Sequence, residues 1–312
     1  MLDQTASMMG AAAPCRGTMA VVLGASLALG LLAAPALGED TATPLLKAPV
    51  VPVPRLFDQA AIDKATSELD GIVADTMKRT GVPGIAVGVV YKDKVIYAKG
   101  FGVREVGKDG AIDPNTVFLL ASVSKPITST IVAKLAGDDV VDWHGAAKSY
   151  NAAFALSDPY VTEHATIADL LSHRSGLRTS SGDLLEDLGF DRDYILSHID
   201  QQPLDPFRVT YHYSNFGYTA GGVAAAAASG RSWEDLAETA LFEPTGMTTA
   251  SYRHADYLAH PDRAHIHARA RRTAPGLHST INAPDAEARP VVPAPRSTDM
   301  LRFLRLNSAT AL

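Results

Sequence analysis

The sequence predicts an α+β fold in which an antiparallel sheet is flanked by helices and a helical domain is inserted. Three observations lead to this prediction: a helical stretch over 58–79, two short apolar stretches joined by a polar turn, and a middle region with little strand pattern. Strands and helices that are segregated along a chain are typical of this fold class.

The first elements are predicted from their periodicity. Apolar residues recur at helical spacing from Asp58 to Arg79. Residues 84–90 and 95–101 are apolar and are joined by the polar residues 91–94, which indicates a β-hairpin. The next helix is expected to continue to about Leu135 and to end before the Gly137-Asp138-Asp139 stretch.

For the middle of the chain, the sequence predicts short helices and loops. We expect a helical piece over 167–173, an alanine-rich helix over 223–229 that ends at Gly230, and a helix capped by Ser232 that runs to Leu241. A last helix is expected to begin at Ser297-Thr298. Residues 255–289 show no period that predicts an element.

The N-terminus is typical of an exported protein. An apolar run from Ala20 to Leu37 follows Arg16, is broken by Pro35 and ends in small residues, which predicts a cleaved signal peptide over about 1–38. Residues 39–58 read as an extended arm. Residues 59–312 are expected to form one domain, with a sheet part over about 59–118 and 240–312 and a helical part over about 119–239. We expect a periplasmic or secreted protein without a membrane span after cleavage.

Composition limits the possible functions. With 46% hydrophobic residues the 312-residue chain can bury a sizeable core, and its net charge of −6 argues against a nucleic-acid partner. Cys15 is the only cysteine and precedes the apolar run, so the mature chain is expected to have neither disulfides nor a catalytic thiol. The oligomeric state is left open.

Ser122-Val123-Ser124-Lys125 carries the clearest chemical signal. Ser122 and Lys125 have the S-x-x-K spacing of acyl-serine enzymes. On a helix, residues three apart lie on one face, so the lysine amine would reach the serine hydroxyl. Pro126 would fall in the first turn, where its missing N–H costs no hydrogen bond.

Further stretches follow this motif in order. They are Leu170-Leu171-Ser172-His173-Arg174-Ser175-Gly176-Leu177, then Tyr211-His212-Tyr213-Ser214-Asn215-Phe216-Gly217-Tyr218, then Leu241-Phe242-Glu243-Pro244-Thr245-Gly246-Met247. From about Val82 to Ser251 the chain resembles the serine β-lactamase superfamily, in particular the branch of class C β-lactamases, related esterases and D-amino-acid peptidases. The resemblance implies a β-lactamase/transpeptidase-like fold and a hydrolase without a cofactor or metal.

The resemblance also implies roles for four residues. Ser122 would be the nucleophile that forms the acyl-enzyme, and Lys125 would help to activate it. Tyr213 would act as general base and acid, and Asn215 would hydrogen-bond the substrate. The expected substrate is a small ester, amide or D-amino-acid peptide.

One motif of the resembled family is missing. That family has K-T-G or H-x-G on a pocket strand, but the last lysine here is Lys148, and none of the five histidines after Asn215 precedes a glycine by two residues. We therefore expect a C-terminally truncated member that lacks the last sheet strands. Losing one oxyanion donor typically lowers the rate roughly 100- to 1,000-fold.

Two readings of function are left open. The first is an exported serine hydrolase, with ester or peptide substrates favoured over β-lactams because the K-T-G motif is absent. The second is a catalytically impaired remnant or binding module of the same family. A metal site at His260, His265 and His267 is disfavoured because no Asp or Cys ligand stands at set spacing. We expect His173 and His212 to have structural and not catalytic roles.

Overall fold

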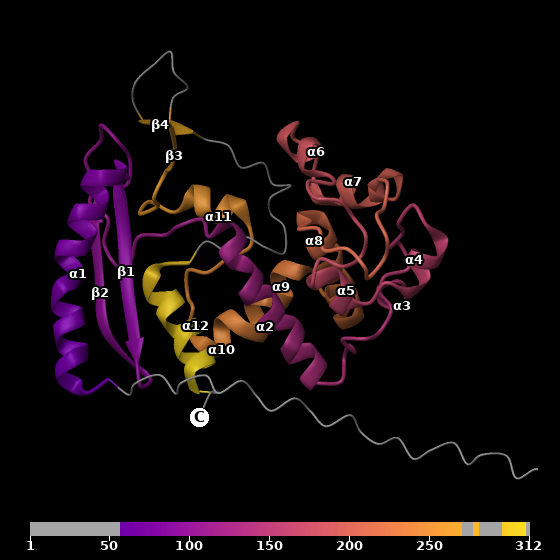
Figure 1. The fold of residues 1–312 in the computed structure, drawn as a ribbon, viewed down its shortest axis with the longest axis horizontal. Coiled ribbons are helices and arrows are strands. Elements are labelled where there is room, and N and C mark those ends of the chain that lie inside the picture. The colour runs from indigo at the N-terminus through magenta and orange to yellow at the C-terminus, as the bar shows by residue number, and fades with distance from the viewer. Residues whose placement is uncertain (1–56, 270–276, 281–294, 310–312) are drawn as a thin grey trace, which may run out of the picture. The chain divides into compact units, whose positions relative to one another are not determined.

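The computed structural model describes residues 57–269, 277–280 and 295–309, and these belong to one compact unit (Figure 1). The expected signal peptide and most of the expected arm lie outside the described residues. In the described part, no helix combines the length and the apolar character that crossing a membrane requires.

The N-terminal layer is a helix against a hairpin. Helix α1 (Gln59–Thr80) begins at the predicted position, where the Asp58 carboxylate accepts a hydrogen bond from the backbone N–H of Ala61 at 2.8 Å. Strands β1 (Gly84–Tyr91) and β2 (Lys94–Gly102) pair antiparallel, as the hairpin pattern predicted. Lys92 and Asp93 form the turn with φ of 48° and 59°, the sign that a tight two-residue hairpin turn needs at both positions.

A helix far along the chain covers the other face of this hairpin. Helix α12 (Ser297–Ala309) packs on β1 and β2, while α1 packs against the same strands from the opposite side (Figure 1). The fit at β1 is close, because a Cβ atom placed on Gly88 would lie 2.6 Å from Leu301 Cδ2. Among the described residues, β1 pairs with β2 alone.

Helix α2 (Ser124–Gly137) lies between the hairpin layer and the helical part (Figure 1). Its buried face joins one hydrophobic core with residues from the end of α8 and from the segments that follow it. The α2 members of that core are Ile127, Ile131, Val132 and Leu135. A second core fills the helical part, with Phe216 and Leu170 fully buried in it.

Short helices make up the helical part, as the weak strand pattern predicted. They are α3 (Ala147–Tyr150), α4 (Pro159–His164), α5 (Ile167–Leu171), α6 (Asp183–Asp187), α7 (Arg192–Ser197) and the 3-10 helix η2 (Ile199–Gln201).

Helix α8 (Asn215–Ser229) is the long helix of this part. It ends at Gly230 as predicted, but it begins at Asn215 and not near Val223. Glycines explain the difference, because Gly217, Gly221 and Gly222 lower helix propensity in the first half of α8.

The chain after α8 continues in short elements. Ser232 caps α9 (Trp233–Ala237) as predicted, and the chain continues through a π-helical segment η3 (Glu238–Phe242) into α10 (Glu243–Thr245). The sequence predicted no element for the next region. The structure has α11 (His254–Ala259) there and a second antiparallel pair, β3 (Ile266–Arg269) with β4 (Leu277–Thr280). The proposed division into a sheet part and a helical part stays a prediction.

Candidate active site

Ser122 lies in a turn that precedes the helix and not on the helix itself. Residues Ala121–Val123 form a 3-10 turn, η1, that leads directly into α2. Ala121 has a φ of 46°, which is uncommon for a residue with a Cβ atom and costs on the order of 1–3 kcal/mol. The Ser124 hydroxyl is buried and donates to the Ala121 carbonyl at 2.6 Å. This bond stabilises the turn, which leaves Ser122 exposed to solvent.

Lys125 lies beneath the exposed serine. Its side chain is buried, and Nζ donates to Ser122 Oγ at 3.2 Å and to Asn215 Oδ1 at 3.1 Å. Nζ also lies 4.6 Å from the centre of the Tyr213 ring, a distance at which a cation is attracted to an aromatic face. The S-x-x-K spacing therefore brings the amine to the hydroxyl even though Ser122 is in a 3-10 turn.

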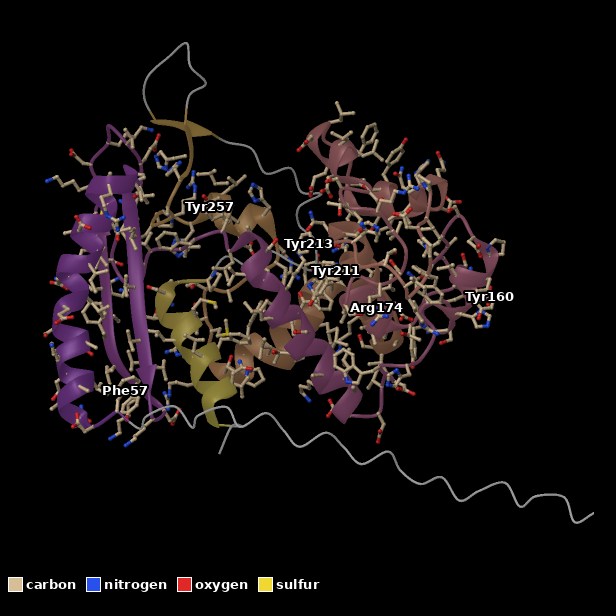
Figure 2. All side chains as sticks on the ribbon, viewed as in Figure 1. Phe57, Tyr160, Arg174, Tyr211, Tyr213 and Tyr257 are labelled. Carbon is tan, nitrogen blue, oxygen red and sulfur yellow. The ribbon has the colours of Figure 1, made fainter. Side chains whose placement is uncertain are left out.

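Tyr213, which is labelled in Figure 2, lies in the chain before α8 and contacts the same serine. Its hydroxyl donates to Ser122 Oγ at 2.6 Å. The next residue, Ser214, caps α8 by accepting a hydrogen bond from the backbone N–H of Gly217 at 3.1 Å. The cap fixes the point at which the extended chain becomes helix, and so holds Tyr213 in place.

Asn215 is the first residue of α8 and contacts Lys125 with its side chain. Its Oδ1 accepts from Lys125 Nζ, while its Nδ2 donates to Asp183 Oδ2 at 3.2 Å. Asp183 is not recognisable from the sequence, because no local pattern connects it with a residue that follows it by 32 positions. The structure thus brings all four predicted residues together and adds a carboxylate behind them.

His173 also borders the site, although the sequence suggested an ordinary histidine at a helix end. It lies beyond the end of α5 with a φ of 61°, and its Nδ1 accepts a hydrogen bond from the Ser214 backbone N–H at 3.2 Å. Its ring centre lies 4.6 Å from that of Tyr213. Burial lowers the pKa of His173, and the positive charge of Lys125 lowers it further. The ring therefore stays neutral at neutral pH and acts as a packing partner of Tyr213.

The other histidines considered contact different groups. His212 Nε2 lies 2.8 Å from Asp205 Oδ2, and His265 Nε2 lies 3.4 Å from Glu105 Oε2. His267 Nε2 accepts from the Val106 backbone N–H at 3.1 Å. Over residues 57–269, 277–280 and 295–309, no group of three or more His, Cys, Asp or Glu side chains is placed to hold a metal ion.

Comparison with known proteins shows which family the chain resembles in sequence. The family model described as Beta-lactamase matches residues 69–309. A curated relative, the unguisins hydrolase ungD' of Aspergillus campestris, is 27% identical over 59% of this chain. The chain covers only 36% of that relative's own length.

Solved structures share the fold. The octameric penicillin-binding protein homologue from Pyrococcus abyssi superimposes with a TM-score of 0.65 over 77% of this chain and 55% of its own, at 20% identity. A class C β-lactamase gives a TM-score of 0.63 over 78% of this chain and 64% of its own, at 19% identity. These similarities confirm the predicted β-lactamase/transpeptidase-like fold. Since the family match spans most of its length, the chain belongs to the Beta-lactamase family.

Proposed function

We propose that the chain is a serine hydrolase that forms an acyl-enzyme on Ser122 while it cleaves a small ester or amide. One observation carries the proposal: the exposed Ser122 Oγ lies 2.6 Å from the Tyr213 hydroxyl and 3.2 Å from Lys125 Nζ. A serine hydroxyl becomes an effective nucleophile when a base is held within hydrogen-bond reach of it. The Tyr213 hydroxyl and the Lys125 amine both lie within hydrogen-bond reach of Ser122 Oγ.

In the acylation step, Tyr213 takes the Ser122 proton as Oγ attacks the substrate carbonyl. The buried ammonium of Lys125 lies close to the Tyr213 ring and favours the phenolate that this role requires. The tetrahedral intermediate then collapses, the bond to the leaving group breaks, and Tyr213 returns the proton to the leaving oxygen or nitrogen. The product of this step is an ester between Ser122 Oγ and the acyl group.

In the deacylation step, water attacks that ester. Tyr213 would accept the water proton and return it to Ser122 Oγ, since the 2.6 Å contact joins these two oxygens directly. Asn215, which already accepts from Lys125, is proposed to place its amide beside the substrate. The hydrolase relative supports the reaction class, and we propose esters, amides or D-amino-acid peptides as substrates.

Covalent capture of Ser122 tests the proposal. The full chain is incubated with a fluorophosphonate, whose phosphorus accepts the serine oxygen while fluoride leaves, and intact mass reports the adduct. Ser122→Ala should prevent the adduct, whereas Ser149→Ala, which removes an exposed serine of α3, should leave it unchanged. In parallel, p-nitrophenyl butyrate hydrolysis should be lost in Ser122→Ala alone.

The pattern of results distinguishes a hydrolase from a binding module. A stoichiometric burst of p-nitrophenol without further turnover would show acylation with slow deacylation. A folded chain that forms no adduct and shows no difference between wild type and Ser122→Ala would contradict the proposal and favour a non-catalytic binding module.

We also propose that the chain is exported and that residues 1–38 are removed. The apolar run and the small residues before Glu39 support this proposal. Sequencing the N-terminus of protein recovered outside the cytoplasm should give Glu39 as the first residue. Recovery of uncleaved chain from the cytoplasm alone would contradict it.

A further inference from the structure

We propose that Asp183 is a positioning residue that fixes the Asn215 amide and, through it, keeps Lys125 charged beneath Ser122. The inference rests on the proposed function, since it assigns a task within the same site. Its basis is a continuous chain of contacts. Asp183 Oδ2 accepts from Asn215 Nδ2 at 3.2 Å, and Asn215 Oδ1 accepts from Lys125 Nζ at 3.1 Å.

The backbone holds Asp183 firmly at this position. Asp183 is the first residue of α6, and its N–H donates to the carbonyl of Ser180 at 3.1 Å. The preceding Gly182 has a φ of 92°, and a Cβ atom there would lie 2.7 Å from Phe216 Cδ2. Because Phe216 follows Asn215 directly in α8, the turn before α6 packs on the helix that carries the amide.

The chemistry of the three groups permits one orientation of the amide. A lysine ammonium only donates hydrogen bonds, and an ionised carboxylate only accepts them. The Asn215 oxygen must therefore face Lys125, and its nitrogen must face Asp183. A flipped amide would place donor against donor on one side and acceptor against acceptor on the other. Asp183 thus selects the amide orientation that Lys125 requires.

The carboxylate also balances the charge around Lys125. Other titratable groups that face this amine include the Tyr213 ring, the Tyr218 ring at 5.5 Å, and His173, whose pKa the lysine lowers. His173 is neutral, and burial raises the pKa of Tyr218 to about 12, so its hydroxyl stays protonated. The negative charge of Asp183 favours the ammonium form of Lys125 and hence the phenolate form of Tyr213 in the reaction.

Two substitutions separate charge from hydrogen bonding. Asp183→Asn removes the charge but keeps an acceptor oxygen, whereas Asp183→Ala removes both. Asp187→Asn makes the same charge change at an exposed residue of α6 and is the matched control. The rate of fluorophosphonate labelling is measured from pH 5 to pH 10 for each full-length variant.

Each variant has a distinct expected profile. Asp183→Asn should move the alkaline limb of the profile to lower pH, because Lys125 loses its proton more readily without the carboxylate. Asp183→Ala should show the same displacement and a labelling rate roughly 10- to 100-fold lower, because the amide is no longer held. Asp183→Glu should restore the alkaline limb. Profiles of Asp183→Asn and Asp183→Ala that superimpose on that of Asp187→Asn would overturn the inference.

A second measurement needs no turnover. In chain labelled with ¹³C at lysine Cε, the Lys125 signal, assigned by its absence in Lys125→Arg, is followed against pH. Its titration midpoint should be lower in Asp183→Asn than in Asp187→Asn, and equal midpoints would contradict the inference. An unlabelled wild type in the first experiment would refute the proposed hydrolase, while this titration would still decide the role of Asp183.

Discussion

Replacing Gly182 by alanine is expected to destabilise the fold, and Gly189 offers an unusually close control. The two glycines flank α6 and have nearly the same φ, 92° for Gly182 and 90° for Gly189. Alanine at either position must adopt a backbone conformation that residues with a Cβ atom rarely take. The two substitutions differ in what the new methyl group meets.

The surroundings of the two positions set the expected magnitudes. At Gly182 the added Cβ would lie 2.7 Å from Phe216 Cδ2 and 2.8 Å from Ile195 Cγ2, while at Gly189 no atom lies within 4 Å. Backbone strain should cost about 1–3 kcal/mol at each position. Overpacking should add about 1–3 kcal/mol at Gly182 only. We therefore expect the free energy of unfolding to fall by about 2–6 kcal/mol in Gly182→Ala and by about 1–3 kcal/mol in Gly189→Ala.

Urea unfolding followed by tryptophan fluorescence measures this difference, since Trp233 is buried in the core. The labelling rate of Ser122 should fall in Gly182→Ala as well, because Asp183 is the next residue in the chain. Unfolding of Gly182→Ala and Gly189→Ala at the same urea concentration would contradict this expectation, since Phe216 and Ile195 would then accommodate the methyl group without a loss of stability.

Three further perturbations test the site and its support. Tyr213→Phe should lower the labelling rate of Ser122 roughly 100- to 10,000-fold with an unchanged circular dichroism spectrum, and a near-normal rate would exclude Tyr213 as the base. Asp169→Asn should lower the free energy of unfolding by about 1–3 kcal/mol at pH 7 in urea titrations, because Arg208 Nη2 donates to Asp169 Oδ2 at 2.8 Å. Burial raises the pKa of Asp169, but the Arg208 guanidinium holds it below its usual value. This stabilisation should be complete above the unfolded pKa of about 3.9 and be lost as pH falls through the lower folded value, so the gap between variant and wild type should shrink near pH 3. For His173, burial and Lys125 lower the pKa, so the free energy of unfolding should rise with pH from the folded value to about 6.5. His173→Gln should remove that rise, and an unchanged pH dependence would show that His173 does not cause it.

The elements predicted well from the sequence are those that local interactions determine. Helix α1 begins at a capping aspartate, and the β1–β2 hairpin has two apolar strands around a polar turn. Helix α8 was predicted only in its second half because its glycines disfavour helix in isolation. In the folded chain they permit close packing, since a Cβ on Gly221 would lie 3.1 Å from Leu171 Cδ2. Tertiary contact, and not propensity, determines where α8 begins.

The residues of the candidate site likewise include some that local sequence predicts and some that it does not. Ser122 and Lys125 were found because they lie three positions apart in one local motif, and Tyr213 and Asn215 were found by resemblance. Asp183 was missed, since it meets Asn215 only after the chain between them has folded. The pair β3–β4 was missed because its strands have only four residues each, too few for a periodic pattern to predict them. The catalytic roles of the site residues stay predictions until Ser122 is labelled.

The packing of α12 on β1 has a consequence for synthesis of the chain. An isolated two-stranded hairpin is only marginally stable in water. The packing of Leu301 of α12 against Gly88 of β1 therefore helps to stabilise the folded hairpin. More than 200 residues separate these two positions in the sequence. At ribosomal speeds, about 10–40 s pass between their emergence. We therefore expect the nascent hairpin to spend this interval with one face uncovered, which makes it a target for chaperones before α12 is translated.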